Sequence, residues 1–274
     1  MAEGYIYIKT HLNGLVLDVD GGNEANGAKV ISRPVASQPA DNQLWRLDYQ
    51  PDKTFLVVSK LAGGKVLDCS NQKQGTQLVV CERHGGESQR WKREGDHLTS
   101  MSGLVADISG CNKSPGAAVV LWSKHKDESP SQLFSFVTPP LYIGCHLSGM
   151  ILDVAGCHDQ NGAKVTPVSA VYPPAPNQKW YLDYQQDDTF FIVSMLNGKV
   201  MDCGSGEKGS HLVVWERHGG KNQLWKRDGQ YLVSLQGNVL DIANSSLTRG
   251  APVVVSSKNT PVTDNQLFEL KIDL

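Results

Sequence analysis

Short apolar runs separated by polar turns recur along the whole chain. In the first 48 residues they lie at 5–8, 15–19, 28–31 and 44–47, and glycine, asparagine or proline stands between successive runs. Short runs with such turn residues between them predict β-strands joined by hairpins. No stretch of useful length keeps its apolar residues at a helical period. The pattern therefore predicts an all-β protein.

This plan of four runs returns six times, and each copy ends in a Gln-x-aromatic motif. The six motifs are Gln43-Leu44-Trp45, Gln89-Arg90-Trp91, Gln132-Leu133-Phe134, Gln178-Lys179-Trp180, Gln223-Leu224-Trp225 and Gln266-Leu267-Phe268. Successive terminal aromatics are 46, 43, 46, 45 and 43 residues apart. A fixed period of this length indicates a repeat architecture.

An aspartate that follows an apolar run marks every repeat and divides the chain in two. These aspartates are Asp18, Asp68, Asp107, Asp153, Asp202 and Asp241. The first and fourth are 135 residues apart, and the other two corresponding pairs are each 134 apart. The pattern breaks at Thr138-Pro139-Pro140 and restarts at Leu141. We therefore expect domains 1–138 and 139–274, with repeats at about 5–48, 49–94, 95–138, 141–183, 184–228 and 229–274.

Two all-β architectures use four-stranded repeats of this length. A six-bladed propeller requires six equivalent repeats, whereas here the spacings cycle in threes and two prolines follow the third repeat. Three four-stranded units instead form a closed barrel capped by hairpins, which leaves no open sheet edge. We therefore expect two tandem β-trefoil domains rather than a propeller.

The composition and the first residues of the chain indicate which partners and which cellular compartment to expect. A length of 274 residues with 40% apolar content suits two ordinary cores, and a formal net charge of −2 argues against a nucleic-acid partner. No run reaches the roughly 18 apolar residues of a membrane helix, so membrane insertion is not expected. Met1-Ala2-Glu3-Gly4 lacks a basic and apolar leader, which predicts cytoplasmic synthesis. Action outside the cell would then need a non-classical route of release.

The six cysteines do not fall at matching positions of the repeats. Cys69 and Cys203 both follow the marker aspartate, but Cys81 stands where the second half has Trp215. A shared disulfide framework is therefore not indicated, and free thiols in a reducing compartment are expected.

The marker aspartate is the first candidate for function, because aspartate is depleted from strands yet ends the same strand six times. It either caps a turn or accepts hydrogen bonds from two vicinal hydroxyls of a ligand. An asparagine precedes the motif glutamine in four repeats and supplies further donors; these are Asn42, Asn177, Asn222 and Asn265. The glutamine itself recurs in all six repeats, which favours hydrogen bonding to backbone within the repeat.

Two kinds of aromatic residue are distinguished by how they recur. The terminal Trp or Phe of the motif is present in every repeat and is expected to fill the barrel core. Trp122 and Trp215 occupy another position, where the remaining repeats have Arg33, Cys81, Val168 and Ser256. A core position would not accept arginine or serine, so these two tryptophans are expected to be exposed platforms.

Histidines recur three residues after the platform position, at His84, His125 and His218. They either donate to a ligand hydroxyl or are simply solvated. The ligand spacings of a zinc site do not accompany them, and no repeat gathers enough carboxylates for calcium, so no metal is expected.

No motif of catalysis or cofactor binding emerges from the chain. Gly204-Ser205-Gly206-Glu207-Lys208-Gly209 matches a dinucleotide fingerprint, but an expected strand follows it where that motif requires a helix. An activated serine or cysteine motif and a phosphate loop are not found either. We therefore expect a protein that is not an enzyme and has no cofactor.

The repeated motifs resemble those of a known family. Six Gln-x-Trp or Gln-x-Phe motifs, each after a Leu-Asp-Val or Leu-Asp-Cys type of segment, are similar to the ricin B-chain type (R-type) lectins, which have the β-trefoil fold. The resemblance covers nearly the whole chain. The segment from Trp215 to Gln223 is most similar to the tandem-repeat galactose-binding lectins of earthworms and other invertebrates.

The resemblance implies one shallow sugar site in each repeat that keeps the necessary residues. Repeat five keeps the full set, Asp202, Trp215, His218, Asn222 and Gln223. Repeat three is second, with Asp107, Trp122, His125 and Gln132, and Ser131 in place of the asparagine. Three repeats hold weaker candidates. They are Asp68, His84 and Gln89 in repeat two; Asp18, Asn42 and Gln43 in repeat one; and Asp241, Asn265 and Gln266 in repeat six. Repeat four is expected to be structural, with Val168 and a loop through Pro173, Pro174 and Pro176.

These residues and the resemblance together predict a lectin for galactose- or N-acetylgalactosamine-terminated glycans on glycoproteins or glycolipids. Each site alone is expected to bind with a Kd of about 10 µM to 1 mM, and several sites together would agglutinate cells. The alternative is a trefoil scaffold without sugar binding, such as a protease inhibitor or an intracellular interaction protein. A toxin or enzyme that uses trefoils for targeting is disfavoured, because the repeats occupy the chain.

Overall fold

The computed structural model describes residues 4–61, 63–171, 173 and 175–272, which fall into two compact units. Unit 1 is Met1–Val137 and unit 2 is Thr138–Leu274. The expected leaderless start at Met1-Ala2-Glu3 and Pro174 of the proline-rich loop lie outside the described residues. The described residues form β-strands and short 3-10 turns with no α-helix, which confirms the all-β prediction. Among them no helix has the length and hydropathy needed to cross a membrane.

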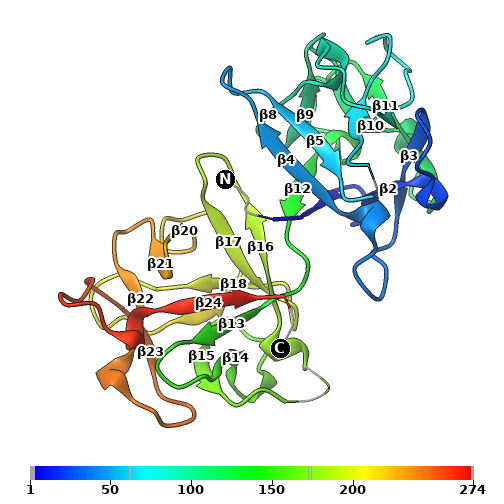
Figure 1. Cartoon of the computed structure of the whole chain (residues 1–274). Helices are drawn as coiled ribbons and strands as arrows, with labels where there is room; N and C mark the ends of the chain where they lie inside the picture. Colours follow the sequence, from blue (N-terminus) through cyan, green and yellow to red (C-terminus); the bar gives the residue numbers. More distant parts are fainter. Residues whose placement is uncertain (1–3, 62, 172, 174, 273–274) are drawn as a thin grey trace. The chain divides into compact units, whose positions relative to one another are not determined.

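The described residues of unit 1 form twelve strands, four from each repeat. Figure 1 draws them as arrows coloured from blue to green. They are β1 (Tyr7–Thr10), β2 (Val16–Val19), β3 (Ala28–Arg33), β4 (Trp45–Tyr49), β5 (Phe55–Ser59), β6 (Val66–Asp68), β7 (Val79–Cys81), β8 (Trp91–Glu94), β9 (His97–Ser100), β10 (Val105–Ile108), β11 (Ala117–Trp122) and β12 (Phe134–Val137).

Six of these strands, two from each repeat, form the barrel wall of unit 1. β1 pairs with β12, β4 with β5, and β8 with β9, all antiparallel. Bridge Ile6–Trp45 joins the first pair to the second, and Phe55–Trp91 joins the second to the third. A 2.8 Å bond from the Phe134 N–H of β12 to the Asp96 carbonyl, directly before β9, joins the third pair to the first. The first strand of the unit thus meets the last, so the sheet closes.

The other six strands of unit 1 form three hairpins that cap one end of the barrel. The hairpins are β2–β3, β6–β7 and β10–β11. Their second strands also meet: β3 pairs with both β7 and β11, and the bridge Gln77–Val120 joins the remaining two repeats. A barrel of six strands capped by three hairpins is the β-trefoil, as the repeats predicted.

Unit 2 repeats this arrangement. Its strands are β13 (Tyr142–Cys145), β14 (Ile151–Val154), β15 (Ala163–Val168), β16 (Trp180–Tyr184), β17 (Phe190–Ser194), β18 (Val200–Asp202), β19 (Val213–Trp215), β20 (Trp225–Asp228), β21 (Tyr231–Ser234), β22 (Val239–Ile242), β23 (Val253–Ser256) and β24 (Phe268–Lys271). β13 pairs with β24, β16 with β17 and β20 with β21, and the capping hairpins are β14–β15, β18–β19 and β22–β23.

Short 3-10 turns lie in two recurring places among the strands. They are η1 (Asp20–Gly22), η2 (Asp41–Gln43), η3 (Glu87–Gln89), η4 (Ser109–Cys111), η5 (Pro130–Gln132), η6 (Ala155–Cys157), η7 (Pro176–Gln178), η8 (Ala243–Ser245) and η9 (Asp264–Gln266). Four of them follow the hairpin strand that bears the marker aspartate. The other five end in the motif glutamine, and each leads directly into the strand of the terminal aromatic.

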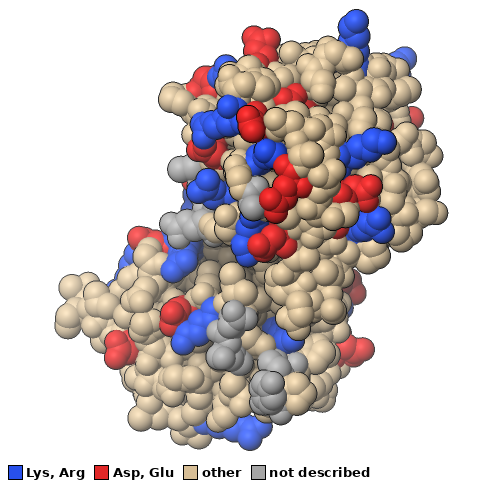
Figure 2. Space-filling model, turned by 45° about the vertical axis from the view of Figure 1, so that its right-hand side comes forward, with Lys and Arg blue, Asp and Glu red and all other residues tan. Residues whose placement is uncertain are grey.

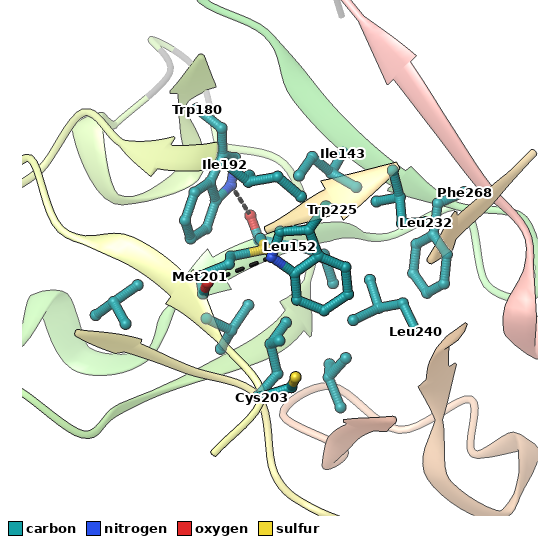
Figure 3. Close-up of a cluster of buried hydrophobic side chains, with 14 of the residues drawn as sticks. Ile143, Leu152, Trp180, Ile192, Met201, Cys203, Trp225, Leu232, Leu240 and Phe268 are labelled. Atoms are coloured by element: carbon teal, nitrogen blue, oxygen red, sulfur yellow. Dashed lines mark hydrogen bonds between the residues drawn. The ribbon is translucent and has the colours of Figure 1, made fainter. Parts of the chain in front are cut away.

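The terminal aromatics of the motif fill the barrel cores, which confirms the prediction. The fully buried ones include Trp45, Trp91, Trp180 and Trp225, and Phe134 and Phe268 are 1% exposed. In unit 2 they pack among Ile143, Leu152, Ile192, Leu232 and Leu240 (Figure 3). Burying one such side chain contributes about 1.5–3 kcal/mol.

Each buried tryptophan is also tied to the hairpin that carries the aspartate. The indole N–H of Trp180 donates to the Leu152 carbonyl at 3.1 Å and that of Trp225 to the Met201 carbonyl at 3.3 Å (Figure 3). Trp45 and Trp91 make the corresponding bonds in unit 1. The acceptor residue always directly precedes the marker aspartate, so the core fixes the position of that carboxylate.

Candidate functional site

The six marker aspartates lie at the ends of the first strand of each capping hairpin and are all buried. Their exposed fractions are between 2% and 7%. In five repeats the amide nitrogen of the motif glutamine donates to one carboxylate oxygen at 2.7–3.0 Å. In repeat four, Asn177 instead donates to Asp153 at 2.6 Å. A buried carboxylate requires such partners, because an unpaired buried charge is strongly unfavourable.

The motif glutamine also holds the loop that precedes it. In repeat five, Gln223 donates to the Glu216 carbonyl at 2.8 Å, and its oxygen accepts the His218 N–H at 2.8 Å. In all six repeats the glutamine oxygen accepts a loop N–H in this way; the donors are Ala36, His84, His125, Val171, His218 and Asn259. The predicted role of the glutamine, bonding backbone within its repeat, is confirmed.

Repeat five surrounds its aspartate with four donors. Asp202 Oδ1 accepts the Gly204 N–H at 2.6 Å and the Asn222 amide at 2.7 Å. Its Oδ2 accepts Gln223 at 3.0 Å and His218 Nε2 at 3.3 Å. Four of the five residues predicted for this site therefore belong to one hydrogen-bonded cluster, and Trp215 is the fifth.

The backbone fixes the protonation pattern of His218 in this cluster. The Gly220 N–H donates to His218 Nδ1 at 3.2 Å, so the neutral ring carries its proton on Nε2, the nitrogen that faces Asp202. The ring is about half exposed, whereas the carboxylate behind it is buried. A ligand hydroxyl that bonds to Asp202 Oδ2 therefore has to displace or share the place of this ring.

Trp215 stands on the same face of the hairpin as Asp202. The strand register pairs Asp202 with Val213, and Trp215 lies two residues further along the same strand. Its side chain is 42% exposed, which confirms the prediction of an exposed aromatic at this position. An open indole face beside a buried carboxylate can offer both a stacking surface and hydrogen-bond acceptors.

Repeat three has the same aromatic with a less crowded carboxylate. Trp122 is 38% exposed and lies two residues beyond Val120, the partner of Asp107. Asp107 accepts Gln132 at 2.7 Å, but His125 Nε2 is 4.0 Å away, too far for a hydrogen bond. This carboxylate is thus more available to a ligand than that of repeat five.

Ser131, which replaces the asparagine of repeat three, bonds to a neighbouring serine of its own segment. Its hydroxyl hydrogen-bonds to the Ser129 hydroxyl at 3.0 Å. The loss of the Asn-type donor, noted in the sequence, therefore leaves one side of Asp107 without a side-chain donor among the described residues.

Repeat two has the carboxylate cluster without the aromatic. Asp68 accepts His84 Nε2 at 3.0 Å, Gln89 at 2.9 Å and the Ser70 N–H at 2.6 Å. Cys81, partly buried, stands at the platform position. Asp68 thus has three of the four types of donor found in repeat five, without the asparagine and without an aromatic at the platform position.

In repeat one the arginine at the platform position pairs with an aspartate other than the marker aspartate. Arg33 pairs with Asp20 at 3.2 Å. Asp18 accepts Gln43 at 2.9 Å, and the Asn42 amide donates to the Val19 carbonyl at 3.5 Å. Burial raises the pKa of Asp18, and the Gln43 hydrogen bond opposes that shift.

Repeats six and four lack a platform. In repeat six, Asp241 accepts Asn265 at 2.8 Å and Gln266 at 2.7 Å, but Ser256 stands at the platform position. In repeat four, Val168 is buried, and burial raises the pKa of Asp153. Neither hairpin offers an aromatic face next to its carboxylate.

Turn capping, one of the two roles considered for the marker aspartate, is present in repeats two and five. The N–H groups of Ser70 and Gly204 each bond to the aspartate two residues earlier, so in repeats two and five the aspartate also caps a turn. The glycine-rich segment that begins at Gly204 therefore serves as a turn against Asp202. The spacing Asp-x-Ser or Asp-x-Gly was the available signal for this contact.

The cysteines beside the marker aspartates are structural thiols. Cys69 donates to the Ser88 carbonyl at 3.0 Å and Cys203 to the Asn222 carbonyl at 3.3 Å. Burial raises the pKa of Cys69 to about 12 and that of Cys203 to about 11. A thiol that stays protonated at neutral pH is a poor nucleophile and a poor metal ligand.

Charge and metal ligands add no further site among the described residues. On the face that Figure 2 shows, basic and acidic side chains are interspersed. In the part of the chain that the structure describes, no group of three or more His, Cys, Asp or Glu side chains gathers to hold a metal ion.

Sequence comparison matches both units to one kind of domain. The ricin-type β-trefoil lectin domain matches residues 4–134, and the related description, ricin-type β-trefoil lectin domain-like, matches residues 176–270. No curated protein matches the chain.

Similar solved structures include single trefoils and longer proteins. The C-half of an earthworm R-type lectin in complex with GalNAc is 30% identical over 49% of this chain and 98% of that chain, with a TM-score of 0.41. A non-toxic homologue of type II RIPs from bitter gourd (Momordica charantia), in complex with α-methyl-D-galactoside, is 22% identical over 97% and 96%, with a TM-score of 0.43. A mosquitocidal holotoxin is 18% identical over 99% of this chain and 34% of that chain, with a TM-score of 0.44. The chain spans about a third of that toxin.

Proposed function

Because the chain belongs to the ricin-type β-trefoil lectins, we propose that it binds glycans that end in galactose or N-acetylgalactosamine. The family assigns carbohydrate binding to the chain. The choice of sugar is the proposal, and it rests on the chemistry that the platforms and carboxylates offer.

The arrangement in repeat five carries this proposal. Asp202 and the exposed Trp215 lie on one face of the same hairpin, and the Asn222 amide reaches Asp202 from the segment before the motif glutamine. Galactose has an apolar face of ring carbons for stacking, and its adjacent 3- and 4-hydroxyls reach a carboxylate and an amide together. In glucose the 4-hydroxyl points to the other side of the ring, so the same contacts are not available at once.

Repeat three supplies the second site. It combines the exposed Trp122 with Asp107, whose carboxylate has a single donor, Gln132, among the side chains of the described residues. With one platform in each unit, the chain has two sites that can engage separate glycans. Repeats one, two and six keep the carboxylate without an aromatic platform and contribute little or no affinity in this proposal.

The two sites together give the protein its useful affinity. One stack and a few hydrogen bonds correspond to a Kd of about 10 µM to 1 mM for a single site. Simultaneous binding of two glycans on one surface adds about 10²- to 10⁴-fold. Binding to glycans on two different cells crosslinks them, so the protein agglutinates cells.

The protein acts by binding alone in this proposal, without catalysis or a cofactor. The buried thiols beside Asp68 and Asp202 stay protonated, and the marker carboxylates are engaged in structural hydrogen bonds. We also propose synthesis in the cytoplasm with release by a non-classical route, because the cysteines are free thiols.

Retention on immobilised lactose tests the proposal. The full chain should bind the resin, elute with free galactose or N-acetylgalactosamine and not elute with the same concentration of glucose. The double variant Trp122→Ala/Trp215→Ala should pass through while keeping the unfolding temperature of the natural chain. Passage of the natural, folded chain through the resin would contradict the proposal.

A further inference from the structure

Every platform position is held by a loop from the neighbouring repeat. In each repeat a glycine of the loop after the marker aspartate donates its N–H to the carbonyl that directly precedes the platform residue of the next repeat in the ring. The six bonds, of 2.7–2.9 Å, are Gly27–Val80, Gly75–Leu121, Gly116–Ser32, Gly162–Val214, Gly209–Val255 and Gly250–Pro167.

The residue before this glycine makes a second bond in three of the six loops. Asn161 Oδ1 accepts the N–H of Glu216 at 3.0 Å, the residue directly after Trp215. Gln74 Oε1 accepts the hydroxyl of Ser123 at 2.7 Å, the residue directly after Trp122. In repeat two, where Cys81 replaces the tryptophan, Asn26 accepts the Glu82 N–H at 2.9 Å.

The other three loops have residues whose side chains cannot accept this bond. The residue before the glycine is Pro115, Lys208 or Arg249. These loops bond beside Arg33, Ser256 and Val168, respectively. Both tryptophan platforms therefore fall among the three positions that are bonded on both sides.

The glycines also lie against the tryptophan rings. A Cβ added at Gly162 would meet Trp215 Cζ3 at 3.6 Å, and one at Gly75 would meet Trp122 Cζ3 at 3.9 Å. Both glycines have φ angles that side chains rarely adopt, +85° and +83°. One edge of each ring therefore lies beside a glycine of the neighbouring repeat, while the side chain stays 38–42% exposed.

We propose that the two tryptophan platforms are each built by two repeats, and that Asn161 and Gln74 are positioning residues for Trp215 and Trp122. Repeat four, which has no platform of its own, then serves the site of repeat five through Asn161 and Gly162. Repeat two serves repeat three in the same way. The consequence for sugar affinity rests on the proposed function, whereas the consequence for ring order does not.

The variant Asn161→Ala in the full chain tests the proposal through the indole ¹H–¹⁵N signal of Trp215, identified with Trp215→Phe. Without sugar, the heteronuclear NOE of this signal should fall, because the ring loses one of its two restraints. With lactose, the Kd read from this signal should rise about 3- to 10-fold, the effect of losing one hydrogen bond, while the Trp122 signal titrates as before. Asn161→Asp keeps an acceptor oxygen and should restore both readings.

Asn26→Ala is the matched control, because it removes the same type of bond beside Cys81 and should leave the Trp215 signal unchanged. Unchanged ring order and unchanged Kd at Trp215 in a folded Asn161→Ala variant would overturn the proposal. If lactose shifts neither tryptophan signal in the natural chain, galactose binding fails, and ring order alone decides: a lower NOE supports the two-repeat platform and an unchanged one rejects it.

Discussion

His218 Nε2 lies 3.3 Å from Asp202 Oδ2, whereas the corresponding atoms of His125 and Asp107 are 4.0 Å apart. Repeat five thus has a carboxylate that is fully hydrogen-bonded before any ligand arrives. Repeat three has the same acid, platform and histidine with the histidine out of reach. His218, Asn222 and Gln223, which belong to the full set of site residues in repeat five, therefore also occupy the carboxylate oxygens of Asp202.

Replacing His218 should make the repeat-five carboxylate easier to reach. In His218→Ala, Asp202 keeps three donors, and a sugar hydroxyl no longer competes with the imidazole. We expect the affinity for lactose at repeat five, read from the Trp215 indole signal, to rise about 2- to 10-fold. His125→Ala is the control, because its ring does not bond to Asp107. A fall in affinity for His218→Ala would show that the ring itself contacts the sugar.

Two tryptophans ten residues apart should give opposite phenotypes. Trp215→Ala removes an exposed platform, so we expect at least about a tenfold loss of affinity at repeat five with an unchanged unfolding temperature. Trp225→Ala empties a fully buried core position and should lower the free energy of unfolding by about 3–5 kcal/mol. Lactose titration and urea unfolding of both variants separate the two roles. Destabilisation by Trp215→Ala equal to that of Trp225→Ala would place both in the core.

The motif glutamine should matter for stability as well as for binding. Gln223→Ala leaves the Glu216 carbonyl, the His218 N–H and one bond of Asp202 without their partner. We expect a loss of about 1–3 kcal/mol in the free energy of unfolding. Gln50→Ala, which loses one bond to the Asp48 carbonyl, should cost less than 1 kcal/mol by the same reasoning. Equal urea midpoints for the two variants would contradict this role.

Asp18 should make the protein less stable as the pH rises. Burial raises its folded-state pKa above the usual 3.8, so folding favours the protonated acid. That contribution is complete below pH 3.8 and is lost as the pH rises through the raised pKa. Asp18→Asn removes it, so the unfolding temperature of the variant relative to the natural chain should increase between about pH 4 and pH 7. A difference that shrinks over this range would contradict the assignment.

Repeat six should accept a sugar once it has a platform and the bond that holds it. It has Asp241, Asn265 and Gln266 in place, and Ser256 pairs with Val239 as Trp215 pairs with Val200. Ser256→Trp with Lys208→Asn should add one lactose to the stoichiometry measured by calorimetry. Ser256→Trp alone should give a weaker additional site. An unchanged stoichiometry in the folded double variant would show that more than these two residues is missing.

The fold and family were predictable because the sequence repeats them. Six Gln-x-aromatic motifs at a fixed period set the core aromatics, and the spacing of the aspartates in threes separated two trefoils from a propeller. The β-trefoil fold and the R-type lectin family are confirmed. The exposure of Trp122 and Trp215 was predictable because their position does not repeat: only these two repeats have an aromatic there, which a core position would not allow.

The contacts that distinguish one repeat from another were not predictable from the pattern. Whether a histidine three residues past the platform reaches its aspartate depends on differences of less than an ångström in the loop, as His218 and His125 show. The loop residue Asn161 acts on Glu216, 55 residues away, because the trefoil places the loop of one repeat against the hairpin of the next. A motif aligned repeat by repeat does not reveal a contact made between repeats.

Calorimetric titration of lactose into the full chain, with glucose as the comparison, tests the central claim most directly. The proposal predicts two lactose molecules per chain with a Kd of about 10 µM to 1 mM, no heat of binding with glucose, and a stoichiometry of one in either Trp122→Ala or Trp215→Ala. Absence of lactose binding by the folded chain, or equal binding of glucose, would contradict it.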